Sequence, residues 1–133
     1  MGEQQIKLPG LVAGESMTTK QYYAVQHSTA ADRTVLLITN ANAQRPIGIL
    51  QNDPGSGEPA EVVVLGMAKA IYGGSITRGD KLACGNDGSL ISDAEVADGS
   101  AVDLHHIAIA LESGSSGDIR WVLVIAPQFI GKE

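Results

Sequence analysis

The sequence predicts a small all-β protein, a single-domain β-barrel or sandwich with at most one short helix, and three observations support this prediction. Sixteen glycines and five prolines divide the chain into short apolar segments, which is typical of strands joined by turns. Turn signals recur roughly every 8–12 residues, the spacing expected of a compact barrel or sandwich. The chain of 133 residues is long enough for one domain with its own core rather than two.

The composition also indicates what fills the core and what covers it. Hydrophobic residues make up 44% of the chain but aromatic residues only 4%, so the core is predicted to consist of Val, Ile, Leu and Ala. Charged residues make up 18%, below the usual quarter. A surface with so few charges indicates self-association.

The first element, residues 1–14, differs from the rest of the chain. Ile6, Leu8 and Leu11 are apolar, but Pro9-Gly10 interrupts them. Two interpretations stay open: a first edge strand of the sheet, or an arm that becomes ordered by packing on a neighbouring molecule. The domain proper is predicted over residues 15–133.

Met17–Ala24 is predicted to form one or two helical turns, with Ser16 or Thr18 as the N-cap. The remaining elements are strands, because each is a short run of apolar and β-branched residues between turn residues. The predicted strands are Tyr23–His27, Thr34–Thr39, Pro46–Gln51, Glu61–Ala70, Lys81–Cys84, Ser89–Ser92, Ile107–Leu111 and Ile119–Ile125.

The connections carry signals of their own. Asn52–Pro59 (NDPGSGEP) is the strongest loop signal in the chain, and Gly85–Gly88 (GNDG) is typical of a hairpin turn. Gly66 lies inside a β-rich run, which predicts a bulge or bend there. Arg78-Gly79-Asp80 is predicted to be a turn with glycine in the left-handed conformation, rather than an adhesion motif.

Charge and hydropathy exclude two classes of partner. Nine Lys and Arg against fifteen Asp and Glu give a net charge of −6, so a nucleic-acid-binding surface is not expected. The longest apolar runs, Val62–Met67 and Trp121–Pro127, are far shorter than a membrane-spanning helix. The N-terminus lacks the features of a signal peptide. No membrane partner is therefore expected.

The residues that could carry catalysis or hold a metal do not make a complete site. Asp103 and His105 share one face of a strand, but one carboxylate and one imidazole leave a zinc site unfilled. The acidic stretch Asp93–Ser100 lacks the ligand spacing of an EF-hand. Cys84, the single cysteine, is interpreted as a small core or rim residue. We expect no enzyme activity, no metal and no cofactor.

One alternative is a small carrier or ligand-binding barrel. The segment Gly74–Leu82 resembles the Gly-Asp hairpin of lipoyl and biotinyl carrier domains, and Gly66–Ala70 faintly resembles their modified-lysine turn. Two observations oppose this alternative. Lys69 precedes the hairpin whereas the lysine of that family follows it, and Lys69 lies in a β-rich run rather than at a turn.

Several segments, in order and with matching spacing, resemble the capsid decoration (cement) proteins of tailed bacteriophages. The resemblance runs from about Leu11 to about Phe129, and each segment alone is only a turn with a strand. The segments that carry it are Leu11–Ser16 with Gln21–Val25, Pro46–Asn52, Glu61–Gly66, Gly73–Leu82, Asp87-Gly88, Ile107–Gly114 and Trp121–Val124.

The resemblance implies a homotrimer, made in the host cytoplasm, that sits on the outer surface of the virion capsid. Its partners would be other copies of itself and the major capsid protein, whose neighbouring subunits it would hold together against internal DNA pressure. No enzyme activity, cofactor or catalytic residue is implied. On physical grounds, the apolar N-terminal segment and the polar loop are the places where neighbour contacts are expected, which singles out Ile6, Leu8, Leu11, Asn52, Asp53 and Glu58.

Overall fold

The structure, a computed structural model, describes residues 5–40, 44–92 and 104–130, which form ten strands and no helix. The short strands are joined by turns in which glycine supplies the left-handed conformation. The strands are β1 (Gln5–Leu8), β2 (Val12–Ala13), β3 (Ala24–His27), β4 (Thr34–Leu37), β5 (Pro46–Leu50), β6 (Val62–Ile71), β7 (Lys81–Cys84), β8 (Leu90–Ser92), β9 (Leu104–Ala110) and β10 (Ile119–Ile130).

All ten strands belong to one sheet, in the order β2-β4-β3-β5-β6-β10-β9-β7-β8, with β1 paired to β6. The prediction of a small all-β domain is confirmed. The sheet is not closed into a barrel, because its path ends at β2 on one side and at β8 on the other. An isolated bridge between Tyr72 and Leu90 brings β8 against the end of β6.

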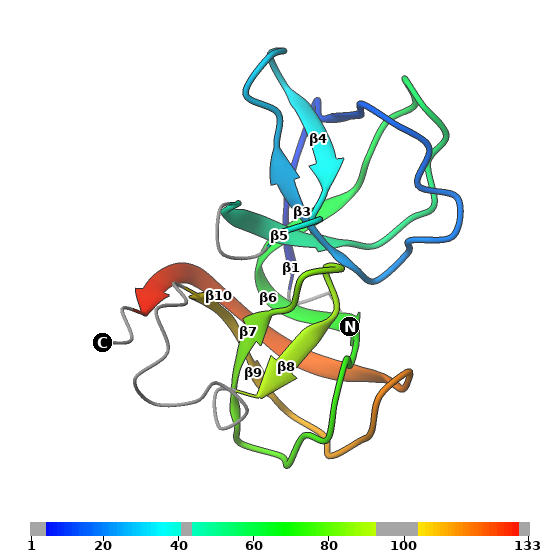
Figure 1. The fold of residues 1–133 in the computed structure, drawn as a ribbon. Coiled ribbons are helices and arrows are strands. Elements are labelled where there is room, and N and C mark those ends of the chain that lie inside the picture. Colours follow the sequence, from blue (N-terminus) through cyan, green and yellow to red (C-terminus); the bar gives the residue numbers. More distant parts are fainter. Residues whose placement is uncertain (1–4, 41–43, 93–103, 131–133) are drawn as a thin grey trace.

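The long strand β6 connects two groups of strands, which Figure 1 shows as an upper and a lower part of the molecule. Its first residues, Val62 and Val63, pair with β5, and residues 66–71 pair with β10 along the same edge. The other edge pairs with β1 between Val62 and Gly66. One strand thus holds both groups in a single sheet.

The apolar side chains form an upper and a lower core, built largely from Val, Ile, Leu and Ala as the composition predicts, and the lower core also takes in Ala24, Ile38 and Ile49 from the upper group. Ile49 and Val63 contribute to one core, whereas their neighbours Leu50 and Val62 contribute to the other. The β5–β6 pairing is therefore where the two cores meet. The upper core contains Leu11, Ala13, Met17, Val25, Val35, Leu50, Ala60 and Val62, and members of the lower core include Tyr72, Leu82, Leu90, Ile107, Val122 and Val124.

The eight predicted strands are all present. The two C-terminal ones are longer than predicted: β9 begins at Leu104 and β10 extends to Ile130. The hairpin prediction is also confirmed, because β7 pairs with β8 and the Gly85 N–H donates to the Ser89 carbonyl at 2.7 Å.

The predicted helical turns at Met17–Ala24 are wrong. This segment forms two successive tight turns, in which the Lys20 N–H donates to Met17 O and the Tyr23 N–H donates to Lys20 O. Tyr22 has a φ of 76°, a left-handed conformation that cannot continue a right-handed helix. Met17 is buried, so this segment serves to cover the upper core.

Gly66, where the sequence predicts a bulge or bend, has an irregular backbone conformation. Its φ is 104°, a conformation that strongly favours glycine. Gly66 is the last residue of β6 paired with β1 and the point where pairing with β10 begins. The glycine therefore lies where β6 passes from one group of strands to the other.

Candidate interaction surface

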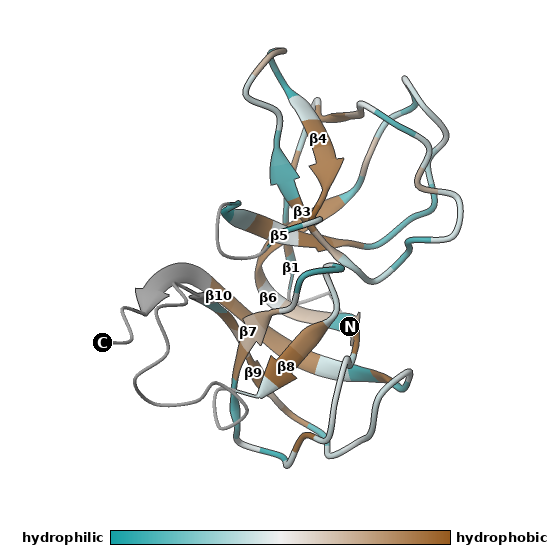
Figure 2. Cartoon of the chain, in the orientation of Figure 1, coloured by the Kyte–Doolittle hydropathy of each residue, from teal (hydrophilic) through white to brown (hydrophobic). Residues whose placement is uncertain are grey.

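The lower part of the sheet has a solvent-facing side that is mostly apolar. Figure 2 shows hydrophobic colouring along much of β10. We call this side the apolar face. It consists of Ile6, Leu65, Met67, Ile71, Ile109, Leu111, Ile119, Trp121 and Leu123, with Lys69 among them.

Strand register places these side chains next to one another. Met67 lies opposite Leu123, and Leu123 lies opposite Ile109 on β9. Ile71 lies opposite Ile119 in the same way. Directly opposed residues of antiparallel strands project from the same side of a sheet, so these pairs form rows across three strands.

The reverse side of the same strands faces the lower core. Ala68, Ala70, Val122 and Val124 alternate with the exposed residues and are buried. In an antiparallel sheet with one side in water, the outward positions are ordinarily polar. Here both sides of β6 and β10 are apolar, so the outward side has the composition of a surface that is covered.

Lys69 and Trp121 occupy the middle of the apolar face. They lie opposite each other in the register, and the Lys69 ammonium sits 5.5 Å from the centre of the Trp121 ring. This is a cation–π geometry. The Trp121 backbone N–H donates to the Glu112 carboxylate at 2.8 Å, and the Gln51 amide donates to the Lys69 carbonyl at 3.0 Å. Lys69 thus lies within a paired strand rather than at the exposed turn that a carrier domain uses for its modified lysine.

The three predicted contact residues of the N-terminal segment have different environments. Ile6 and Leu8 lie on β1 and are exposed, and Ile6 lies opposite Leu65, so it extends the apolar face. Leu11 is buried in the upper core. It therefore has little side-chain surface left for contact with a neighbour.

Of the three predicted contact residues of the polar loop, two shape the loop itself. The Asn52 amide donates to the Pro59 carbonyl and its oxygen accepts from the Glu61 N–H, both at 3.0 Å. The Glu58 carboxylate accepts from the Gly55 N–H at 2.6 Å. Asp53 is exposed. Asn52 and Glu58 thus hold the loop conformation.

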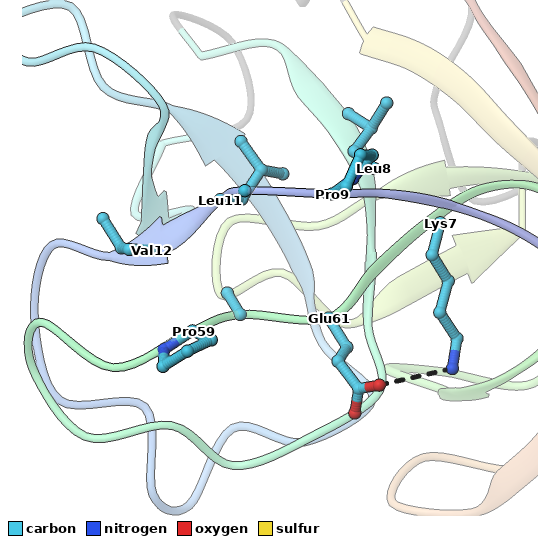
Figure 3. Close-up of a pocket in the computed structure, with 9 residues that line it drawn as sticks. Lys7, Leu8, Pro9, Leu11, Val12, Pro59 and Glu61 are labelled. Atoms are coloured by element: carbon cyan, nitrogen blue, oxygen red, sulfur yellow. Dashed lines mark hydrogen bonds and ion pairs between the residues drawn. The ribbon is translucent and has the colours of Figure 1, made fainter.

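An open hollow of about 350 Å³ lies between the N-terminal segment and the end of this loop (Figure 3). It is lined by residues 7–12 and 59–61, and at its mouth the Lys7 ammonium lies 3.5 Å from a Glu61 carboxylate oxygen. Both side chains of this ion pair are well exposed; such pairs contribute little to stability. The lining is mainly apolar and offers no converging set of polar groups for a small ligand.

The described residues do not assemble a metal site. No group of three or more His, Cys, Asp or Glu within them is placed to hold a metal ion. Asp103 and the stretch Asp93–Ser100 lie outside the described residues, as does the side chain of His105. Arg78-Gly79-Asp80 forms the predicted turn, with Gly79 at a φ of 90°. No helix among the described residues is long and apolar enough to cross a membrane.

Cys84 is a buried member of the lower core. Burial, with a smaller contribution from the negative charge of Asp87, raises the pKa of its thiol to about 12. Because the thiolate is the reactive form, we expect a thiol reagent at mildly alkaline pH to leave the folded protein unmodified and to label one thiol in guanidinium chloride. Rapid labelling of the folded protein, followed by intact mass, would contradict this placement.

The signal for the apolar face is visible in the sequence but ambiguous. The runs Val62–Met67 and Trp121–Pro127 are apolar at both odd and even positions, which indicates strands covered on both sides. A run of this kind does not show whether the layer that covers the second side of the strands comes from the same chain. The structure shows that, on the described residues, it does not.

The comparisons with known proteins point to one kind of fold. No family model matches the chain, and no curated protein matches its sequence. Among solved structures, the chain is similar to the N base of the head fiber gp8.5 of bacteriophage phi29, with a TM-score of 0.59 and 20% sequence identity. The match covers 86% of this chain and 89% of that chain. The two proteins therefore share a fold over most of both chains.

Proposed function

We propose that this chain is a structural protein of a tailed-bacteriophage head: a decoration protein that binds the outer surface of the capsid as a homotrimer and holds neighbouring major capsid proteins together. The observation that carries the proposal is the fold shared with the base of a phage head fiber over 86% of the chain. The resemblance of the sequence to cement proteins supports the same role independently.

The physical properties of the chain suit this role. A cement protein stabilises a shell by adding buried contact area between subunits, and three linked copies multiply the strength of modest single contacts. The exposed side chains of Ile6 and Leu8 on β1 provide apolar contact points near the edge of the sheet. The net charge of −6 affects the rate and the salt dependence of docking more than its final strength. The proposal includes no catalysis and no cofactor.

The experiment is co-sedimentation with empty shells, assembled from the major capsid protein of the phage whose genome encodes this chain. The purified protein is added after assembly, so that only the outer surface is available to it. We expect saturable binding that follows the number of capsid subunits. Protein that remains in the supernatant at all shell concentrations would contradict the proposal.

Removal of residues 1–9 is expected to weaken this binding while leaving the fold intact. The deletion takes away β1, whose side chains are mostly exposed and which pairs only with β6 among the described strands. Leu11 and the rest of the upper core remain. Circular dichroism and co-sedimentation measure the two effects separately.

A double variant, Ile6→Ser with Leu8→Ser, serves as the matched control for that deletion, because it keeps the strand and removes only its apolar side chains. Weaker binding by both proteins is the expected result. Unchanged binding by the double variant would show that the apolar side chains of β1 are needed neither for contact with the shell nor for the contact between copies that multiplies its strength.

A further inference from the structure

We infer that the apolar face is the surface through which copies of this chain contact one another, with Trp121 at the centre of the contact. The inference rests on the proposed function, because it says where the proposed trimer is held together. Three copies whose apolar faces turn toward a common axis would bury this side of β6 and β10. The shell would then be bound by other surfaces, among them the polar loop.

The size of the apolar face fits this role. Its seven well-exposed side chains range from 37% exposed for Leu123 to 54% for Ile6. Together with the half-buried Ile71 and Ile109, they present on the order of 700 Å² of surface, which exceeds the usual largest patch of a monomer and approaches the ~800 Å² that each partner contributes to a stable interface.

The composition of the face suits a partner of the same kind. The exposed Lys81 lies opposite Ile109 and borders the apolar face at β7. Within the face as defined, Lys69 is the only charged side chain, and its ammonium is held over the Trp121 ring. This arrangement lets the aliphatic part of the lysine lie along the apolar surface. Apolar side chains of packed sheets interdigitate readily, and three copies of this face would supply such side chains around their common axis.

The order of events in the proposed function favours a second copy over the capsid protein as the occupant. A decoration protein that is added to a finished shell exists first in solution, where an uncovered patch of this size promotes aggregation. Contact between copies covers the patch before the shell is reached. The low charge content of the chain, 18%, agrees with a surface that is partly hidden in an assembly.

The test uses Leu123→Glu and Leu65→Glu in the full-length chain. Both positions point outward and neither belongs to a core, so the fold should survive, and far-UV circular dichroism checks this. Thr29→Glu is the matched control: it adds the same charge at an exposed position in the β3–β4 connection. The native mass is measured by light scattering across a range of protein concentrations.

We expect the unmodified chain and Thr29→Glu to have a mass of three times 13.8 kDa, about 41 kDa. Leu123→Glu and Leu65→Glu should fall toward 13.8 kDa. Folded variants that keep the mass of the unmodified chain would overturn the inference. If they keep that mass but lose binding to shells, the face contacts the capsid protein instead, and the inference is again overturned.

The fluorescence of Trp121, the single tryptophan of the chain, gives a second readout. It is 38% exposed in one copy, so contact between copies should shift its emission to shorter wavelength and protect it from a soluble quencher. Dilution or the Leu123→Glu substitution should reverse both effects. Emission of the unmodified chain that is quenched as strongly as that of Leu123→Glu would contradict the inference. Shell binding is measured separately. An unmodified chain that is monomeric and still binds shells would overturn this inference but not the proposal that the chain binds phage heads.

Discussion

The substitution Gly48→Ala should destabilise the protein by about 2–4 kcal/mol, because a methyl group at this position collides with backbone. A Cβ built on Gly48 lies 2.4 Å from the Val63 carbonyl oxygen and 2.6 Å from a Val62 methyl carbon. Both neighbours belong to β6, at the pairing where the two cores meet. To accept the methyl group, β5 and β6 would have to separate, and both cores would loosen. Urea denaturation followed by circular dichroism measures the change.

Gly57→Ala is the control for this prediction. Gly57 has a φ of 82°, and nothing lies within 4 Å of a Cβ built on it. Its substitution therefore costs only the strain of a left-handed residue, about 1 kcal/mol. If the two variants lost equal stability, the close approach at Gly48 would not be important for the fold.

Truncation of Tyr72 to alanine should destabilise the protein by about 3–5 kcal/mol, the range observed when a large aromatic side chain is removed from a core. Tyr72 follows β6 and is fully buried in the lower core. Its hydroxyl donates to the Glu112 carbonyl at 2.6 Å, and its own backbone bonds to Gly117 and Asp118. The residue thus ties the end of β6 to the connection between β9 and β10. Chemical denaturation measures the loss.

Tyr72→Phe isolates the hydroxyl from the ring. It keeps the packing and should cost about 1–2 kcal/mol, the loss of one hydrogen bond. The pH dependence gives an independent check. Burial, followed by the negative charge of Glu112, raises the pKa of Tyr72, so above about pH 10 the unfolded chain loses this proton before the folded chain does. Stability therefore falls as the pH rises through this range, and the decline should be shallower in Tyr72→Phe.

The strands could be predicted from the sequence because their signals are local. Lys81–Cys84 and Ser89–Ser92 are apolar runs around a glycine-rich turn, and they form β7 and β8 with the predicted pairing. The failure at Met17–Ala24 has a physical cause. The turns there are held by distant partners, since the Met17 N–H donates to Pro54 O and the Tyr22 N–H donates to Leu50 O. Local propensity contains no information about such contacts.

The candidate site was predictable only in part. Ile6 and Leu8 are exposed apolar residues as expected, whereas Leu11 belongs to the upper core. The sequence places a turn at Pro9-Gly10 but does not give the direction of the chain after it. That direction decides which of the apolar residues face inward. The apolar face combines residues from β1, β6, β9 and β10, so it exists only once the sheet has formed.

The most direct test of the central proposal is a comparison of empty heads with and without the added protein by electron cryomicroscopy. We expect additional three-lobed density on the outer surface, between neighbouring major capsid proteins, into which three copies of the chain fit with their Trp121 side chains toward the common axis. Heads that show no additional density, or density that a single isolated copy fills, would contradict the proposal.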